Sequence, residues 1–416
     1  MTSAPIRKLG VVGLGYIGLP TAALFASRGV AVAGFDVAAE IVDTVNRGGV
    51  HIVEPGLDIA VRAAVTSGLL KASTRAEPCD AFIIAVPTPF REGNVPDVSF
   101  IEAAADALAP VLREGNLVVL ESTSPVGTTR AMAERFQRLR PDLRFPVNGE
   151  PESVFVAHCP ERVLPGNVMR ELIENDRVVG GLSPASTERA IAMYKQLVEG
   201  DCIATDADTA EMVKLTENAY RDVNIAFANE LSLVCDRLRL NVWDVIKLAN
   251  HHPRVNILRP GPGVGGHCIA VDPWFIVHSA PAEARLIRTA REVNDGKPGV
   301  VLAAIRQAAG RERSPVIACL GLAFKPDIDD LRQSPALDIA SRLAGAELGE
   351  LLVVEPHISA LPAALSGRRG VRLATTEEAL AKANVVALLV NHRAFSAIDP
   401  QRLAGKTVIN ACGWRQ

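Results

Sequence analysis

The chain has little excess charge, no paired cysteine motif and no long apolar run. It carries 44 Lys and Arg against 47 Asp and Glu among 416 residues, and this balance disfavours nucleic acid and anionic membranes as partners. Seven scattered cysteines without a CxxC pair argue against a zinc site or a disulfide framework. No apolar run reaches the roughly 18 residues of a membrane span, and the N-terminus lacks a secretory leader pattern. We therefore expect a reduced, cytoplasmic, soluble enzyme without a metal.

Both ends of the chain alternate short apolar runs with helical patterns, whereas the middle is helical. Residues 207–249 and 284–298 carry helical periodicity with few breakers. Continuous apolar strands separated by helices indicate a parallel sheet covered on both faces. We therefore predict an α/β fold, with two Rossmann-like doubly wound parallel-sheet domains (1–205 and 301–416) joined by a central helical domain (206–300). The strand-like runs are 8–15, 30–37, 79–86, 116–123 and 152–160 in the first part, and 315–324, 350–356, 385–391 and 407–413 in the last.

A glycine-rich turn near the N-terminus predicts a dinucleotide site. "VVGLGYIG" places Gly13, Gly15 and Gly18 as G-x-G-x-x-G between a strand and a helix. In that setting the first glycine makes the tight turn, the second lets the backbone approach a pyrophosphate, and the third packs helix on strand. The next strand ends at Asp36, where a carboxylate would bind a ribose 2′-hydroxyl and repel a 2′-phosphate. The pattern favours NAD over NADP; a glycine-rich turn in an unrelated α/β fold is the alternative.

Two hydroxyl-rich loops, "AVPTP" and "ESTSPVGTT", each follow a predicted strand. Ligands of open α/β sheets bind beyond the carboxyl ends of the strands. Thr88, Ser122 and Thr123 are therefore candidates to face the nicotinamide or the substrate. Helix capping explains such residues equally well, and the spacing leaves both interpretations open.

The stretch "GPGVGGHCIAVDPWF" places Cys268, next to His267, in a loop rich in glycine and proline. A nucleophilic thiolate needs access and a lowered pKa, whereas most free cysteines are small buried hydrophobes. Lys214 and Asn218 are four residues apart, on one face of a helical segment. Glu161 follows a strand between two prolines. Ordinary solvation explains each of these polar residues in isolation.

Taken together, these motifs resemble the UDP-glucose/GDP-mannose dehydrogenase family over essentially the whole chain. The matching pieces occur in family order and are highly specific as a set. They are "GLGYIGLP", "ESTSPVGTT", "CPERVLPG", "KLTENAY", "GPGVGGHCIAVDPWF" and "FKPDIDDLRQSP".

The resemblance implies oxidation of the C6 hydroxyl of a nucleotide sugar in two steps, each with one NAD. The family's cysteine, here Cys268, captures the intermediate aldehyde as a thiohemiacetal, and a second oxidation gives a thioester that water hydrolyses to a uronic acid. By matched position, Lys214 stabilises negative charge on the oxygen and Asn218 binds it. Asp272 positions water or transfers a proton, Thr123 orders water, and Glu161 is the general base or orients it.

The resemblance also implies binding sets for both ligands. The NAD contacts expected are Gly13, Gly15, Tyr16, Ile17, Gly18, Asp36, Pro87, Thr88, Ser122, Thr123 and Arg332. The substrate contacts expected are Glu161, Arg162, Val163, Leu164, Lys214, Asn218, Arg254, Gly265 and Lys325, with Lys325 on the UDP pyrophosphate.

The substrate implied is a UDP-N-acetylhexosamine. The stretch after Cys268 favours the manno epimer, and the gluco epimer stays open. Arg254 matches an arginine that reaches the neighbouring subunit's substrate, which implies a homodimer or higher oligomer. Two other classes are weighed: a two-electron β-hydroxyacid dehydrogenase, which needs neither Cys268 nor a second α/β domain, and a catalytically silent nucleotide-sugar-binding protein, for which Cys268, Lys214 or Asp272 would be lost.

Two local features depart from or add to this pattern. "NACG", with Asn410 and Cys412, stands where the family has "DAKG" or similar, which leaves the contacts to UDP uncertain. Arg285, Arg288 and Arg291 recur every three residues. A solvated basic face is favoured for them over recognition of the acetamido or diphosphate group.

Overall fold

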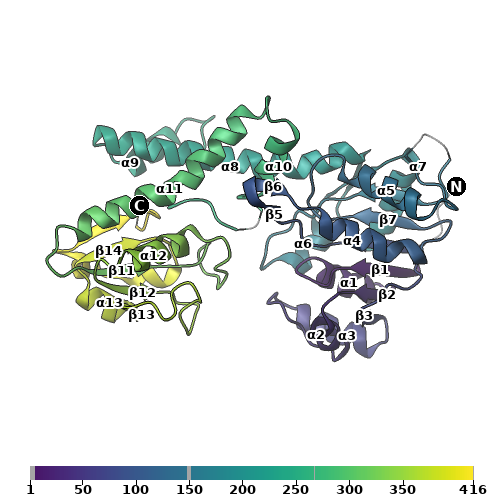
Figure 1. Ribbon diagram of the computed structural model, residues 1–416, viewed down its shortest axis with the longest axis horizontal. Coiled ribbons are helices and arrows are strands. Elements are labelled where there is room, and N and C mark those ends of the chain that lie inside the picture. The colour runs from purple at the N-terminus through teal and green to yellow at the C-terminus, as the bar shows by residue number, and fades with distance from the viewer. Residues whose placement is uncertain (1–4, 148–150, 267, 416) are drawn as a thin grey trace. The chain divides into compact units, whose positions relative to one another are not determined.

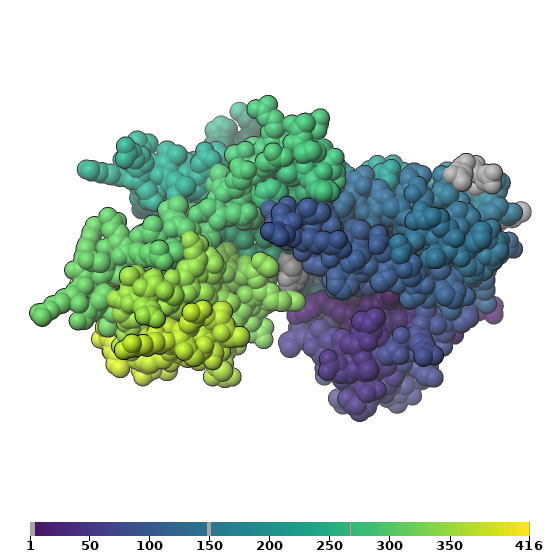
Figure 2. Space-filling view, in the orientation of Figure 1, coloured from purple at the N-terminus to yellow at the C-terminus, as the bar shows by residue number. Residues whose placement is uncertain are grey.

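Residues 5–147, 151–266 and 268–415 are described by the computed structural model. By its internal contacts the chain divides into two units, Met1–Thr216 and Glu217–Gln416. The space-filling view shows each unit as a closely packed body (Figure 2). Across the described residues, no helix combines the length and apolarity that crossing a membrane would require.

Eight strands of the first unit form one sheet (Figure 1), and the glycine turn follows its strand β1. The order reverses between β1 and β4, so the first strand has the second on one side and the fourth on the other. Such a switch point is where open α/β sheets bind ligands. In spatial order the strands are β10 (Cys202–Asp206), β9 (Arg177–Gly181), β8 (Phe155–His158), β7 (Leu117–Leu120), β4 (Ala81–Ile84), β1 (Lys8–Val12), β2 (Ala31–Phe35) and β3 (Leu70–Ser73).

Helices cover both faces of this sheet, as predicted for a doubly wound domain, because its strands are apolar on both sides. Two separate apolar cores result, one on each face. The first face carries α1 (Gly18–Ser27), α2 (Ala39–Asn46), α3 (Leu57–Thr66), α6 (Val168–Glu174) and α7 (Pro184–Tyr194); the second carries α4 (Ser99–Leu108) and α5 (Thr128–Leu139). A two-stranded hairpin of β5 (Phe90–Arg91) and β6 (Val95–Pro96) stands apart from the sheet.

The five strands predicted for the first part pair in parallel, whereas β9, which was not predicted, runs antiparallel to β8. The connection between them, residues 159–176, contains α6, and the chain enters β9 at the edge where β8 ends. The first residue of β9, Arg177, therefore lies at the edge where β7 and β8 end.

The second unit combines helices with a five-stranded parallel sheet (Figure 1). Its order, β13 (Val371–Leu373), β12 (Glu350–Val354), β11 (Val316–Leu320), β14 (Val385–Leu388) and β15 (Thr407–Asn410), again has a switch point, here between β11 and β14. One face packs on α11 (Arg285–Ala309) and α12 (Pro335–Ala346), and the other on α13 (Thr376–Lys382). The remaining helices are α8 (Ala207–Leu238), which begins in the first unit, α9 (Val242–Ala249) and α10 (Asp272–Ser279).

Candidate active site

The three glycines of the first turn have the geometry that the sequence predicts. Gly13 has a φ of +88°, and a Cβ there would lie 2.5 Å from the carbonyl oxygen of Ala85. A Cβ on Gly18 would lie 1.8 Å from the carbonyl oxygen of Gly13, so helix α1 packs directly on the turn. A Cβ on Gly15 would meet no protein atom within 4 Å. This open backbone at the start of α1 fits the approach of a pyrophosphate.

Asp36 follows β2 and closes the same turn. Its Oδ2 accepts a hydrogen bond from the amide of Leu14 at 2.9 Å, and its Oδ1 accepts one from the amide of Ala38 at 3.0 Å. The carboxylate thus stabilises the glycine turn by a hydrogen bond, and it is half-buried just after β2. The residues present fit the ribose and pyrophosphate of NAD.

Replacing Asp36 with alanine is expected to lower kcat/KM for NAD by at least about tenfold. The ratio of kcat/KM for NAD to kcat/KM for NADP should fall by a similar factor. The cause is loss of both the ribose acceptor and the repulsion of a 2′-phosphate. Steady-state kinetics with both dinucleotides measure it, with the exposed Glu40→Gln as control. An unchanged preference would exclude Asp36 as the ribose ligand.

The hydroxyls of the next two loops join those loops to one another. Ser122 is buried, and its Oγ accepts from the amide of Val86 at 2.9 Å. Thr88 donates its hydroxyl to the carbonyl oxygen of Thr123 at 2.6 Å. Neither makes the helix cap that was the alternative interpretation. These bonds fix the loops after β4 and β7 at the switch point, beside the glycine turn.

Glu161 lies in a buried, charged surrounding at the end of β8. It is 9% exposed, and its Oε1 accepts from the amide of Val163. Burial raises the pKa of Glu161, and the positive charges of Lys214 and Arg177 oppose that rise. The structure thus brings Glu161 and Lys214 of the first unit near one another. A carboxyl with a raised pKa beside a lysine is the kind of group that transfers protons.

Behind this loop lies a buried group that the sequence reasoning missed. Glu121 accepts from the hydroxyl of Tyr194 at 2.7 Å and lies 4.0 Å from the guanidinium of Arg177. Burial raises the pKa of Glu121, with Arg177 acting against it. Glu54, also buried, accepts from the amides of Gly166 and Val168 at 2.8 Å and so holds the far end of the Glu161 loop. Single carboxylates of this kind carry no pattern that marks them in a sequence.

Glu211 anchors the start of α8, one turn before Lys214. It accepts from the amides of Gly127 and Thr129, at 2.6 and 2.7 Å, and from the hydroxyl of Thr129 at 2.6 Å. These bonds join α8 to the beginning of α5. Burial raises the pKa of Glu211 to about 7 in spite of them.

This raised pKa predicts a pH-dependent cost of folding. Between the ordinary glutamate pKa and about 7, folded Glu211 keeps a proton that the unfolded chain has lost, so stability falls as pH rises through that window. Glu211→Gln does not titrate, and its Tm relative to wild type is expected to rise by a few degrees from pH 5 to pH 8. Thermal melts measure it, with the exposed Glu230→Gln as control. A difference independent of pH would contradict the assignment.

In the second unit, Asn218 and Asp272 meet in a direct hydrogen bond. Nδ2 of Asn218 donates to Oδ2 of Asp272 at 2.6 Å. Asp272 is buried and begins α10, and the carbonyl oxygen of Cys268 accepts from the amides of Val271 and Asp272. All seven cysteines lie among the described residues, and Cys268 alone is exposed. It therefore has the access that a nucleophile needs. His267 lies outside the described residues.

The glycines before Cys268 allow close packing of the loop, because the positions of their missing side chains face protein. A Cβ on Gly265 would lie 2.6 Å from the carbonyl oxygen of Gln333, and one on Gly266 would lie 2.9 Å from the ring of Phe324. A Cβ on Gly263 would lie 2.9 Å from Pro335. The loop backbone is pressed against the segment that carries Lys325 and Arg332.

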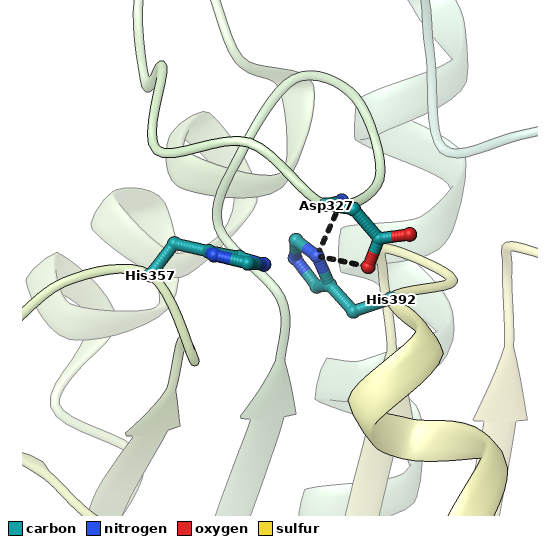
Figure 3. Close-up of side chains that lie close together, drawn as sticks. All are labelled: Asp327, His357 and His392. Atoms are coloured by element: carbon teal, nitrogen blue, oxygen red, sulfur yellow. Dashed lines mark hydrogen bonds and ion pairs between the residues drawn. The ribbon is translucent and has the colours of Figure 1, made fainter.

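That segment is held at the switch point of the second sheet by His392 (Figure 3). Nδ1 of His392 accepts from the amide of Asp327 at 2.9 Å, and Nε2 lies 3.0 Å from Oε2 of Glu355. His357 and Asp327 approach His392 closely enough to suggest a cation site. However, Nδ1 of His392 is already occupied by an amide proton. The cluster instead positions the loop of Lys325, whose side chain is exposed.

The remaining predicted residues are placed as follows. Arg332 forms a bidentate ion pair with Asp330. Arg254 and Pro87 are exposed. Asn410 ends β15 and accepts from the amide of Trp414, and Cys412 follows that strand. The solvated basic face predicted for three arginines is wrong for Arg291, which is 1% exposed and paired with acids. Tyr16, Ile17, Arg162 and Val163 are half-buried, and Leu164 is exposed.

A glycine turn, an acid after the second strand and two doubly wound sheets define an NAD-dependent oxidoreductase with a second nucleotide-binding domain. Models of the UDP-glucose/GDP-mannose dehydrogenase family match the chain in three segments: the NAD binding domain at 7–198, the central domain at 208–296 and the UDP binding domain at 318–412. The chain belongs to this family. The second α/β domain argues against the two-electron β-hydroxyacid dehydrogenase alternative.

Several relatives are similar over nearly their whole length. An NDP-N-acetyl-D-galactosaminuronic acid dehydrogenase of Ralstonia nicotianae is 60% identical, covering 98% of this chain and 96% of that protein. A UDP-N-acetyl-D-mannosamine dehydrogenase of Campylobacter jejuni is 58% identical, covering 95% and 98%. Among solved structures, the UDP-D-ManNAc dehydrogenase of Pyrococcus horikoshii is similar with a TM-score of 0.87 at 37% identity, covering 98% of this chain and 95% of that one.

Proposed function

We propose that the protein oxidises the C6 hydroxyl of UDP-N-acetyl-D-mannosamine to the uronic acid, with two NAD consumed in succession. The single observation that carries this proposal is Cys268, exposed in its glycine-shaped loop. It is supported by the matched family motifs and by the name of the relative from Campylobacter jejuni, at 58% identity. The seven cysteines are thiols and not disulfides, which supports a reducing compartment, and we place the enzyme in the cytoplasm.

The proposed chemistry balances as one alcohol and one water converted to a carboxylate. NAD accepts the hydride in each oxidation. The first oxidation removes a hydride from C6 and a proton from its hydroxyl. The thiolate of Cys268 then adds to the aldehyde carbon, and removal of a second hydride leaves a thioester. Water attacks that carbon, the C–S bond breaks, the thiolate is regenerated, and three protons are released overall.

The other polar residues support these steps. Lys214 stabilises negative charge on the C6 oxygen, and Asn218 donates to it. Glu161 accepts the proton of the attacking water, which Thr123 orders. Asp272, fixed by its bond to Asn218, transfers or positions the proton during capture. Lys325 and Arg254 contact the UDP sugar, and Arg332 contacts the dinucleotide.

A second candidate substrate is the galacto-configured UDP-N-acetylhexosamine. It is favoured by the relative from Ralstonia nicotianae, at 60% identity and named for N-acetyl-D-galactosaminuronic acid. The gluco epimer is the third.

The three sugars can be compared directly with purified enzyme and NAD, following NADH in epimerase-free assays. We expect kcat/KM for the manno sugar to exceed the other two by at least about tenfold. A higher value for the galacto or gluco sugar would keep the mechanism and overturn the substrate. Absence of NADH from all three would favour the catalytically silent binding protein.

An exposed apolar stripe on α8 supports a homo-oligomer. Tyr220, Phe227 and Val234 recur every seven residues and are exposed, Tyr220 by 72% and Phe227 by 57%. Such residues on a helix surface mark a protein interface. We propose that this stripe pairs with a second copy of the chain.

Phe227→Asp is expected to raise the dimer dissociation constant by at least about tenfold, because it buries an unpaired charge. Sedimentation over a concentration series measures it. Asp236→Asn, exposed on the opposite side of α8, is the control. A fully active wild-type monomer would contradict the interface.

Arg254 can be tested by mixing subunits. If it serves the neighbouring site, random mixing of inactive Cys268→Ala and Arg254→Ala subunits restores about a quarter of wild-type activity, because one site of each hybrid pair is intact. No recovery would contradict its action across the interface.

A further inference from the structure

The buried side of α8 carries several polar residues, opposite the exposed apolar stripe. Asn218, Asp222 and Asn229 are spaced by four and seven residues and so lie on one face of the helix. Asp222 and Asn229 are fully buried. Burying such groups is costly unless each is hydrogen-bonded, so their partners must be accounted for.

The partners come from α11 and form a continuous ladder. Oδ1 of Asp222 accepts from Nη1 of Arg291 at 2.6 Å and from Nδ2 of Asn294 at 2.8 Å. Asn294 in turn accepts, through Oδ1, from Nδ2 of Asn229 at 2.8 Å. Arg291 also pairs with Asp295. The bond from Nδ2 of Asn229 to Asn294 fixes the orientation of the Asn229 side-chain amide. Its oxygen, Oδ1, therefore points away from Asn294.

That oxygen holds the first residue of the loop Gly261–Asp272, which carries Cys268. Oδ1 of Asn229 accepts from the amide of Gly261 at 2.8 Å. The exit of the same loop is held by Asn218, which donates to Asp272 at 2.6 Å. Asn218 and Asn229 are eleven residues apart, about 16 Å along one helix. Helix α8 thus forms a hydrogen bond with each end of the loop that carries Cys268.

The ladder is better explained by positioning than by stability. A buried ion pair contributes little net stability compared with apolar packing of the same volume. A buried hydrogen-bonded network does, however, select one arrangement of the groups that it joins. This holds for the bonded atoms of the ladder, although Oδ2 of Asp222 and Nε of Arg291 have no hydrogen-bond partner among the described residues. Capture of an aldehyde by a thiolate depends strongly on such placement, because small displacements of reacting groups are costly in rate.

We propose that Asp222, Arg291, Asn294 and Asn229 are positioning residues, which fix the entrance of the Gly261–Asp272 loop so that Cys268 captures the aldehyde before it escapes. The inference rests on the proposed role of Cys268 as nucleophile. It predicts that breaking the ladder leaves the first oxidation largely intact and impairs capture.

The hydrogen bond from the amide of Gly261 to Oδ1 of Asn229 is called the tether here. Two variants break it, one at each partner. Asn229→Leu removes the acceptor, and Gly261→Pro removes the donor without altering the helix pair. Each has a matched control. Lys297→Met deletes a buried contact to Ser232 between the same two helices and leaves the loop bond in place. Gly261→Ala keeps the amide proton, and its Cβ would come no closer than 3.7 Å to the carbonyl oxygen of Gly263.

Two readouts separate positioning from a structural role. In both tether variants we expect hydrazine-trapped aldehyde to rise to at least about a fifth of the product, with the rate of first-turnover NADH formation within about twofold of wild type. We also expect the iodoacetamide alkylation rate of Cys268 to change by at least about fivefold. The controls should match wild type in both readouts, whatever their Tm.

Unchanged aldehyde release and unchanged alkylation in both tether variants, with wild type forming two NADH per sugar, would overturn the inference alone. Wild-type enzyme that forms only one NADH per sugar would instead contradict the proposed function. The alkylation rates do not depend on turnover, so the two failures are distinguishable.

Discussion

Cys268→Ala is expected to abolish release of the uronic acid, lowering its rate by about a thousandfold or more. Without the thiolate, the aldehyde has no covalent partner for the second oxidation. Product analysis by mass spectrometry, alongside NADH formation, measures the loss. Binding of NAD and of the UDP sugar should persist, because neither depends on the sulfur.

The matched control is Cys412→Ala, since Cys412 is half-buried and follows β15, far along the chain from the proposed chemistry. Burial raises the pKa of its thiol to about 12, so it is a poor nucleophile at neutral pH. Uronic acid formed at the wild-type rate by Cys268→Ala would exclude the thioester mechanism.

Glu161→Gln is expected to stall the enzyme as its thioester. Glutamine keeps the acceptor for the amide of Val163 but cannot take a proton from water, so hydrolysis should slow by about a hundredfold or more while both oxidations proceed. Intact-protein mass spectrometry should then show the acyl group on Cys268. If no acyl-enzyme were found and turnover were preserved, Glu161 would be excluded as the base in thioester hydrolysis.

The same residue sets the expected pH dependence. Burial raises the pKa of Glu161, and a base acts only when deprotonated. As pH is lowered, the hydrolysis rate should therefore begin to fall at a higher pH than it would for a glutamate of ordinary pKa. The slower hydrolysis of Glu161→Gln should not show this acid-side decrease. Pre-steady-state hydrolysis measured over pH, with salt held constant, tests this.

Local backbone requirements explain why the NAD site was predictable. Gly13, Gly18 and Asp36 act through contacts with residues near them in the Rossmann unit, and each leaves a fixed spacing in the sequence. The central strands were predictable for a similar reason, because burial on both faces demands uninterrupted apolar runs. Strand β9 and the edge strands β3, β10 and β13 were not predicted, and these edge strands are partly exposed and so lack such runs.

Contacts between distant segments were not predictable. The glycines before Cys268 fit against Phe324, Gln333 and Pro335, more than fifty residues away. Arg291 looks solvated in the sequence, because its partner Asp222 lies on another helix. Helix α11 continues through Pro298 since its later residues pack on the second sheet. Within residues 207–249 the helical stretch breaks at Arg239, which takes a φ of +61°, before Asn241 caps α9.

The measurement that tests the central claim most directly is the ratio of NADH to uronic acid at completion, with UDP-N-acetyl-D-mannosamine limiting. The proposed chemistry predicts two NADH per uronic acid and no free aldehyde trapped by hydrazine. One NADH per sugar, with aldehyde as the product, would contradict it, because Cys268 would then have no part in a second oxidation.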